Sequence, residues 1–593
     1  MKKRDLIISI CLILAVTFTS FFPSLKIGFD NRDDNFYVTE NPLIKELSWE
    51  NIKTIFSRPY MGHYHPLTLL SYSLEYLFFK LNPFIYHATN LILHLCNSLL
   101  VFWFIFLLTD SLLASLVVAL FFGIHPMHVE SVTWVSERKD VLYSFFFLGS
   151  MICYLFYRRT KEMKYYYLLF FLFVLSLLSK VMAMPLPFVL LLFDYHFDRK
   201  FDKNLLIEKA PFFVLAFCFG LIAISIPGSG GGAKPEYPLS IFSKIFIFID
   251  IFIFYLAKLI IPAKLSCLYP SPREMITPWP YIFLYLPILA GFLIVFLILI
   301  KDTKKIIFGL LFFFVTIAPA LPLKTVADRF TYIPSIGIFY IFGEVISYLY
   351  WRRIKDSRMM RTLFLIVLIG IIGVFSFLTW EGSRVWKDSM ALWDNVIKKY
   401  PNIPKAYASR GEAYSEIGQY DQAILDYTKA LKINPKYSEA YYDRGNAYGK
   451  KEMLDQAILD YTKALEINPK YSEAYYNRGN AYGKKDQFDQ AILDYTKALE
   501  INPNYVEAYT NRGSVYYVKH QYERAISDFS KALEINPGFS LAYFNKALAC
   551  EMTGQLWDAI QAYKGFIRNA EPHQSQQIEI ARERIKELSS GRR

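Results

Sequence analysis

The chain has 593 residues, of which 54% are hydrophobic and 18% aromatic, which argues against a purely soluble fold and indicates a multi-span membrane protein with an appended soluble part. The formal net charge of +13 does not indicate a nucleic-acid partner, because Lys and Arg stand in short clusters between apolar runs and no nucleic-acid-binding motif accompanies them. The six cysteines show neither a disulfide framework nor the spacing of a zinc site.

Eleven apolar runs are candidates for membrane spans, which need about 20 residues each. They lie at 6–22, 84–108, 110–124, 141–157, 165–179, 181–194, 211–227, 279–300, 305–323, 330–350 and 360–380. A further run at 241–262 carries Lys244, Asp250 and Lys258, which would be costly at the bilayer centre. We expect this run to lie along the outer interface or half-inserted in it.

Basic clusters between the runs predict the orientation of the chain. MKKR at the N-terminus, RRTKEMK (158–164) and WRRIKDSRMMR (351–361) all fall on the cytoplasmic side if the chain crosses eleven times. The first run has a basic start like a signal peptide but no small-residue cleavage site, so we expect a retained signal anchor. Everything after Thr379 is then predicted on the extracytoplasmic side.

Carboxylates gather directly after the first apolar run, in FDNRDDNFYVTENP (29–42). Asp33 and Asp34 are adjacent there, and Asp30 precedes them as a minor candidate. Acidic side chains next to a membrane are ordinarily solvated loop charges unless a functional site uses them. These residues alone leave both interpretations open.

Other charged residues are predicted on the same side, in GIHPMHVESVTWVSERKD (123–140) and KTVADRF (324–330). Carboxylates beside such cations suit a reaction in which a base removes a hydroxyl proton while Arg or Lys holds the phosphate of a lipid-borne leaving group. The candidate residues are Asp33, Asp34 and Glu130 for catalysis, and Arg138, Lys139, Arg329 and Lys180 for the donor phosphate.

Two of these features have competing interpretations. Lys180 lies between two apolar runs and is either a snorkelling charge or a phosphate contact. His125 and His128 form either a hydrogen-bonded turn or, with Glu130, a metal site; Pro126 breaks the helix that would align them, so a divalent metal is left open but not predicted. Motifs of nucleotide binding and of serine hydrolases are missing from the sequence.

From about residue 404 the sequence repeats with a period of 34 residues, marked by Asn-Pro at 434, 468, 502 and 536. The packing positions of the first repeat fit the tetratricopeptide pattern: Tyr407, Gly411, Tyr414, Ala423, Tyr427, Ala430 and Pro435. The small glycine should let helix A of each repeat approach helix B, and proline should end helix B. A fifth, degenerate repeat and a polar capping helix are predicted to complete the stack.

The concave surface of such a stack is a candidate groove for an extended polypeptide. Asn side chains can pair with the N–H and C=O groups of any peptide backbone. The candidate groove residues are Tyr442, Asn446, Tyr476, Asn477 and Asn480. The alternative is a merely solvated repeat surface.

Several stretches of the chain resemble the bacterial relatives of the transmembrane and tetratricopeptide repeat-containing O-mannosyltransferases. They include HYHPLTLLSYSLEYLFFKLNPFIYHATN, FFGIHPMHVESVTWVSERKDVLYSFFFL, LLSKVMAMPLPFVLLLFDY, VADRFTYIPSIGIF and WKDSMALWDNVIKKYPN. The resemblance implies a glycosyltransferase of the GT-C type in the bacterial inner membrane, with a polyprenyl-phosphate sugar as donor and mannose as the sugar. It also implies a catalytic base in the first outer loop, on Asp33 or Asp34.

We therefore predict an all-α protein: a polytopic helical bundle followed by an α-solenoid. The predicted parts are a glycosyltransferase domain at 1–380, a connector at 381–403, five repeats at 404–573, and a capping helix with a tail at 574–593. The predicted partners are membrane lipid, the lipid-linked sugar and extended protein acceptors carrying Ser or Thr. Two alternatives are a non-enzymatic membrane scaffold and a polymerase or ligase of lipid-linked glycans.

Overall fold

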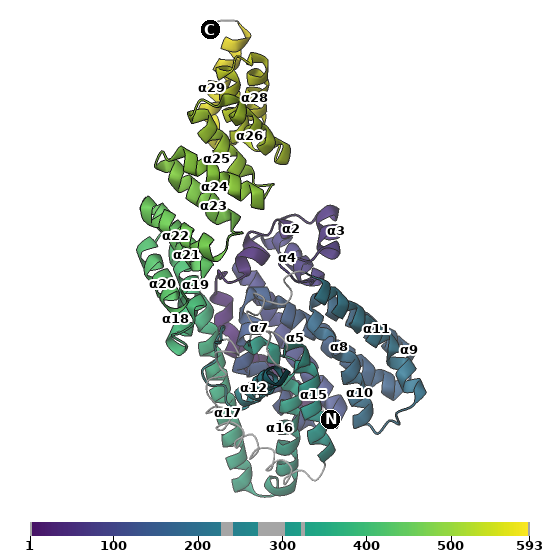
Figure 1. Ribbon diagram of the computed structural model, residues 1–593. Helices are drawn as coiled ribbons and strands as arrows, with labels where there is room; N and C mark the ends of the chain where they lie inside the picture. The colour runs from purple at the N-terminus through teal and green to yellow at the C-terminus, as the bar shows by residue number, and fades with distance from the viewer. Residues whose placement is uncertain (1–2, 227–240, 271–302, 322–325, 591–593) are drawn as a thin grey trace. The chain divides into compact units, whose positions relative to one another are not determined.

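A computed structural model describes residues 3–226, 241–270, 303–321 and 326–590 of the chain (Figure 1). Within these ranges the chain is helical, and the β pairing found there is one isolated bridge between Tyr60 and His63. The all-α prediction is confirmed. The chain divides into two compact units, Met1–Pro401 and Asn402–Arg593, which are described separately below.

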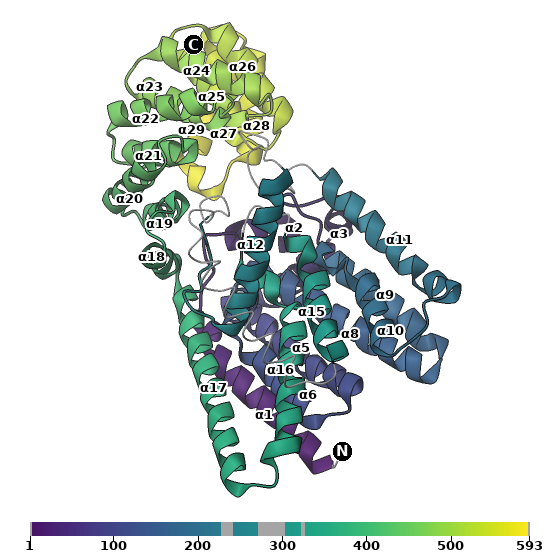
Figure 2. The ribbon, with the colours of Figure 1, turned by 60° about the horizontal axis from the view of Figure 1, so that its bottom comes forward.

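The first unit contains long helices that follow the apolar runs, because a backbone in lipid must satisfy its hydrogen bonds within the segment, and shorter helices between them. They are α1 Lys3–Phe21, α2 Pro42–Lys45, α3 Trp49–Ser57, α4 Pro66–Phe79, α5 Pro83–Thr109, α6 Leu112–Ile124, α7 Val129–Thr133, α8 Arg138–Thr160, α9 Met163–Ser179, α10 Leu186–His196, α11 Lys203–Ser225, α12 Ile241–Ile260, α15 Thr303–Ile317, α16 Ser335–Leu349, α17 Arg358–Arg384 and α18 Ser389–Lys399. The packed pairs include α8 with α9, α5 with α6, and α15 with α16 (Figure 2).

Six helices in the described ranges are long and apolar enough to cross a membrane, or up to seven if one bent pair is a single span. The six are Lys3–Lys26, Pro83–Thr109, Val135–Thr160, Lys203–Ser225, Thr303–Ala320 and Arg358–Lys387. The bent pair joins Leu112–Ile124 to Pro126–Thr133 at 50°, while Met163–Ser179 and Val181–His196 are shorter apolar helices. The predicted run at 279–300 lies outside the described residues.

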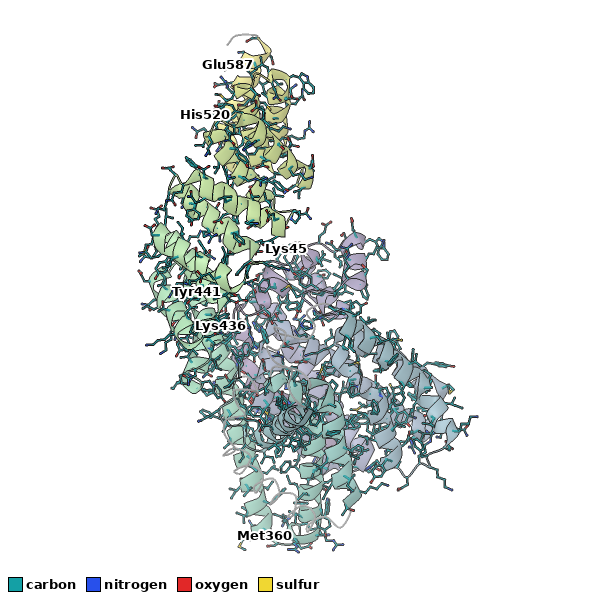
Figure 3. All side chains as sticks on the ribbon, in the orientation of Figure 1. Lys45, Met360, Lys436, Tyr441, His520 and Glu587 are labelled. Atoms are coloured by element: carbon teal, nitrogen blue, oxygen red, sulfur yellow. The ribbon has the colours of Figure 1, made fainter. Side chains whose placement is uncertain are left out.

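Helix α17 shows why the bundle needs lipid around it. Leu363, Ile366 and Ile369 each expose half or more of their side-chain surface, and Met360 near the start of the helix is labelled in Figure 3. Such an apolar stripe is not stable in water. The structure therefore supports a multi-pass membrane protein.

Short helices lie between the long helices, and most of the charged residues considered below lie in them or close to them in the chain. These short helices are η2 Asn35–Thr39, η3 Pro126–His128, η4 Val135–Glu137, η5 Val181–Ala183, η7 Asp328–Thr331 and η9 Val385–Lys387. The break at His125 arises because Pro126 cannot continue α6. The chain consequently turns and brings Glu130 close to Arg32 and Arg329.

The second unit is a stack of helix pairs. Its helices are α19 Pro404–Glu416, α20 Tyr420–Ile433, α21 Ser438–Lys450, α22 Leu454–Ile467, α23 Ser472–Lys484, α24 Phe488–Ile501, α25 Val506–Val518, α26 Tyr522–Ile535, α27 Ser540–Met552, α28 Leu556–Asn569 and α29 Ser575–Ser589. Helix α29 covers the last pair, where Ala581 packs with Tyr563 and Phe566.

The expected role of the repeat glycines is confirmed. A Cβ atom added at the glycine would lie 2.7 to 2.9 Å from a ring carbon of the facing helix, so only glycine fits. The facing pairs are Gly411 with Tyr427, Gly445 with Tyr461, Gly479 with Tyr495, and Gly513 with Phe529. Each of these helix pairs is also joined by a two-pronged ion pair, such as Arg478 with Asp494 at 2.7 Å.

Candidate functional site

The acidic turn, residues 30–34, follows α1 and its short extension. Its backbone is fixed by its own carboxylates, because the Arg32 N–H donates to Asp30 at 2.7 Å and the Asp30 N–H donates to Asp34 at 3.3 Å. Asp34 is buried and also accepts hydrogen bonds from the backbone N–H of Ser136 at 2.9 Å and from its hydroxyl at 2.5 Å. Burial raises the pKa of Asp34 to about 6, although the Ser136 donors act in the opposite direction.

The two adjacent aspartates therefore have different surroundings. Asp33 is half-buried, and no hydrogen bond or ion pair of its carboxylate exists in the described part of the chain. Its carboxylate lies close enough to the Tyr37 ring to contribute, after burial, to raising the pKa of that phenol. Asp34 is held by hydrogen bonds from Ser136 and Asp30, whereas the Asp33 carboxylate has no such partner among the described residues.

Four cations, one in this turn and three from other elements, are called the cation cluster: Arg32, Lys139, Lys180 and Arg329. They come from four separate elements, namely the acidic turn, the start of α8, the residue after α9, and η7. Each exposes between 12% and 15% of its side chain.

Three buried carboxylates form ion pairs with the cation cluster. Glu137 pairs with Lys139 at 3.3 Å, with Lys180 at 3.4 Å and with Arg329 at 3.2 Å. Asp140 pairs with Lys180 at 2.5 Å, and Glu130 pairs with Arg32 at 3.2 Å and also with Arg329. These carboxylates are only 2% to 3% exposed, so the cations form the accessible side of the network.

The structure brings most of the sequence-predicted residues together. Asp33, Asp34, Glu130, Lys139, Lys180 and Arg329 all belong to the turn or the network. Lys180 forms ion pairs with Glu137 and Asp140 within the protein. Arg32 was not selected from the sequence, although it stands inside the quoted acidic stretch.

Arg138 lies apart from these residues. Its guanidinium is fully buried and donates to Asn90 at 2.6 Å and to the Tyr86 carbonyl at 2.8 Å. It also pairs with Glu75 at 2.8 Å. With these partners Arg138 ties α8 to α4 and α5, and it does not reach the cation cluster.

A pair of histidines borders the cluster. Burial, followed by the charges of Lys139 and Lys180, lowers the pKa of His63 to about 4. His65 is 4% exposed, and its Nε2 atom makes no hydrogen bond within the described residues. Burial is the main cause of the lowered pKa of His63, and the positive charges of Lys139 and Lys180 add to it.

His125 and His128 belong to the buried core of the bundle. His128 contacts the Phe122 carbonyl at 2.8 Å and the Ser335 hydroxyl at 3.2 Å, and His125 contacts the Leu259 carbonyl at 3.1 Å. These contacts fit the hydrogen-bonded turn. Across the described ranges, no group of three or more His, Cys, Asp or Glu residues is placed to hold a metal ion.

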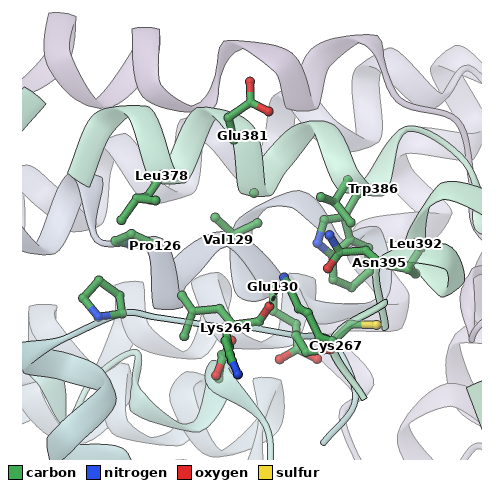
Figure 4. A pocket seen from close by; sticks show the side chains of 17 residues that line it. Pro126, Val129, Glu130, Lys264, Cys267, Leu378, Glu381, Trp386, Leu392 and Asn395 are labelled. Atoms are coloured by element: carbon green, nitrogen blue, oxygen red, sulfur yellow. Dashed lines mark hydrogen bonds between the residues drawn. The ribbon is translucent and has the colours of Figure 1, made fainter. Parts of the chain in front are cut away.

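Glu130 also lines a cavity of about 350 Å³, which we call the Glu130 cavity. Its other lining residues are Pro126, Val129, Pro262, Lys264, Leu265, Ser266, Cys267, Asp328, Leu378, Glu381, Gly382, Val385, Trp386, Leu392, Asn395 and Lys399. Figure 4 shows Leu378 and Pro126 on one side and Trp386 and Asn395 on the other. No sequence pattern indicates this cavity, because its walls come from four segments that are distant in the chain.

The predicted groove residues of the repeats form a ladder along the stack. The Asn477 amide donates to the Tyr442 hydroxyl at 3.0 Å and to Asn446 at 2.9 Å. One repeat later, Asn511 repeats these contacts with Tyr476 and Asn480. These side chains therefore join neighbouring repeats, in addition to any contact they make with a ligand.

Comparisons with known families match the repeat region. The tetratricopeptide repeat model matches residues 438–471, 472–505 and 506–539, and related repeat models match 392–424, 411–452 and 529–561. Among solved structures, the chain is similar to MamA, with 30% identity over 27% of this chain and 93% of that chain and a TM-score of 0.26.

Among curated proteins, the chain is similar to human protein O-mannosyl-transferase TMTC3, at 33% identity over 156 residues, which are 24% of this chain and 16% of the human protein. It is 31% identical to Xenopus laevis tmtc2 over 151 residues (24% of this chain and 18% of that protein). It is 35% identical to Drosophila melanogaster Tmtc3 over 111 residues (15% and 12%). The matches thus span less than a fifth of each relative, and the chain joins tetratricopeptide repeats to a membrane bundle while resembling O-mannosyl-transferases in part.

Proposed function

We propose that the chain is a membrane glycosyltransferase that moves a hexose, mannose in our proposal, from a polyprenyl-phosphate donor to a Ser or Thr hydroxyl of an extracytoplasmic protein. The observation that carries this proposal is the cation cluster beside the acidic turn. It combines accessible cations, which suit a phosphate, with an accessible carboxylate, which suits a base. The partial likeness to O-mannosyl-transferases supports the choice of sugar.

The reaction assigns a role to each group. Asp33 accepts the proton of the acceptor hydroxyl while the hydroxyl oxygen forms a bond to the anomeric carbon of the sugar. The bond from that carbon to the phosphate oxygen breaks, and polyprenyl phosphate leaves with the electron pair. Lys139, Lys180 and Arg329 stabilise the charge that grows on the departing phosphate.

Asp34 and Glu130 act as positioning residues in this scheme. Asp34 fixes the turn through Ser136, so that the neighbouring Asp33 carboxylate is presented to the substrate. Glu130 orients Arg32 and Arg329 by accepting from both. Arg138 holds α8 in place and takes no part in phosphate binding.

The repeats supply the acceptor in this proposal. A stack of helix pairs presents an extended surface, along which the Tyr and Asn ladder repeats every 34 residues. A peptide in extended form could follow this ladder. In this proposal the N-terminus lies in the cytoplasm and the repeats lie outside it. A reporter enzyme fused after Arg593 tests the side of the repeats.

The decisive experiment supplies membranes with labelled polyprenyl-phosphate mannose and measures label on protein. Asp33→Asn should reduce transfer by about 100-fold or more, since a general base contributes about 10²–10⁴. Glu46→Gln is a matched control, because Glu46 is an exposed acid in the same loop outside the network. Equal transfer by wild type and Asp33→Asn would overturn the assignment of the base, and absence of label on protein in wild type would overturn the proposed function.

A further inference from the structure

We propose that the Glu130 cavity binds the hexose ring of the lipid-linked donor and that Ser266 and Asn395 distinguish one hexose from another. This inference rests on the proposed function, which names the donor but leaves open where its sugar lies. The cavity belongs wholly to the first unit of the chain.

The first argument is the position of the cavity beside the cation cluster. In a polyprenyl-phosphate hexose a single oxygen joins the phosphate to the sugar, so the two binding sites must adjoin. Glu130 lines the cavity and also binds Arg32 and Arg329 of the cluster. Asp328 lines the cavity while its neighbour Arg329 belongs to the cluster.

The second argument is the chemistry of the walls. Ser266 lines the cavity and is 6% exposed, and its buried hydroxyl has no hydrogen-bond partner within the described ranges. Asn395 adds an amide, which can both donate and accept. Burial, followed by the charge of Glu130, raises the pKa of Asp328 to about 7, so this carboxyl also alternates between donor and acceptor near neutral pH.

An apolar and aromatic side completes the cavity. Trp386 lines it, and its ring lies 5.6 Å from that of Trp134, which in turn packs against Arg32 of the cluster. Leu378 and Val129 are further apolar lining residues. A hexose has hydroxyl groups at its edge and C–H groups on its faces, and therefore matches a wall that is partly polar and partly aromatic.

The third argument is size. A cavity of about 350 Å³ is at the small end of the 300–1,000 Å³ that ligand pockets occupy. This volume suits one sugar ring better than an extended polypeptide of several residues. The acceptor would then approach from the side of Asp33.

The test uses the full-length protein in detergent and methyl α-mannoside as the probe, followed by saturation-transfer NMR and tryptophan fluorescence. Asn395→Ala and Ser266→Ala should each weaken binding by about 2- to 12-fold, the range of a single hydrogen bond. Lys398→Ala, an exposed position on the same helix as Asn395, is the control and should bind as wild type does. In the transfer assay, the two variants should raise KM for the donor and reduce the preference for mannose over glucose donors.

The outcomes separate this inference from the proposed function. If transfer proceeds but both variants bind the probe and choose donors as wild type does, the cavity assignment is wrong while the proposed function stands. If the variants raise KM for the acceptor instead, the cavity holds polypeptide and the inference is overturned. If wild type transfers nothing but binds the probe in a manner that depends on Asn395 and Ser266, the sugar site stands and the proposed function fails.

Discussion

Two glycines of α23 allow a sharp test of how the repeats pack. At Gly479 a Cβ atom would lie 2.8 Å from a ring carbon of Tyr495, which is 3% exposed and cannot easily move. At Gly483, one turn later, the nearest atom would be the Tyr495 hydroxyl at 3.9 Å. The same substitution to alanine therefore meets a packed ring at one position and free space at the other.

The two substitutions should have opposite effects on stability. Alanine gains about 1 kcal/mol over glycine in a helix interior at both positions. At Gly479 the overpacking costs about 1–3 kcal/mol, so the net change is a loss of up to about 2 kcal/mol. At Gly483 the gain remains, and the two variants should differ by roughly 1–3 kcal/mol in free energy of unfolding.

Urea unfolding of the 402–593 unit, followed by circular dichroism, measures this difference. Gly479→Ala should lower the midpoint and Gly483→Ala should raise it, with similar slopes. Gly445 and Gly449 provide an internal replicate in the preceding repeat, where the corresponding distances are 2.7 and 3.6 Å. If both alanines of a pair raise the midpoint, the close approach of helix A to helix B is not the reason for the glycine.

Three further predictions concern the site and the repeat turns. Lys180→Gln should raise KM for the donor by about 10- to 150-fold, because a hydrogen bond to a charged group contributes about 1.5–3 kcal/mol. Lys53→Gln, at an exposed position, is the control and should leave KM for the donor unchanged. Because the pKa of Asp34 is raised to about 6, its contribution to stability is complete below about pH 4 and is lost as pH rises through 6. Between pH 4 and 7 the free energy of unfolding of Asp34→Asn should therefore rise by about 3 kcal/mol relative to that of wild type, as measured by thermal unfolding. If the stabilities of the two proteins change in parallel with pH, this prediction is contradicted. Glu452→Gly should stabilise the repeats by about 1 kcal/mol in urea unfolding, because Glu452 has a positive φ of 58°. Gly418 and Gly554, with φ of 76° and 75°, occupy the equivalent position in other repeats, as does His520 (Figure 3). Glu452→Ala keeps the backbone strain and is the control.

The repeats were predictable from sequence because each element is specified locally. A glycine facing an aromatic ring and an Asn-Pro helix end recur every 34 residues, and each repeat contacts mainly its neighbours. The ladder of Asn477 and Asn446 was not predictable in the same way. An amide that can pair with a peptide can equally pair with the next repeat, and the sequence does not distinguish these partners.

At Arg138 and Lys139, too, the sequence does not show which partner each side chain contacts. Both cations are adjacent in sequence, but successive residues of a helix point about 100° apart, so one neighbour can face the cation cluster while the other faces the bundle. Lys139 pairs with Glu137 in the cluster, whereas Arg138 turns to Asn90 and Glu75. The Glu130 cavity is even harder to predict from the sequence, because Ser266 and Asn395 belong to distant segments without a shared motif.

The charge arrangement explains why so many carboxylates gather in one region of an apolar chain. Glu137 and Asp140 are buried behind the cations, and their attraction offsets the cost of holding Lys180 and Arg329 in a partly desolvated place. The four cations are the more exposed side of the network, in front of its three carboxylates. A phosphate that gains negative charge as the sugar leaves would therefore interact more strongly with the cluster than the intact donor does, and an interaction that strengthens along the reaction lowers its barrier.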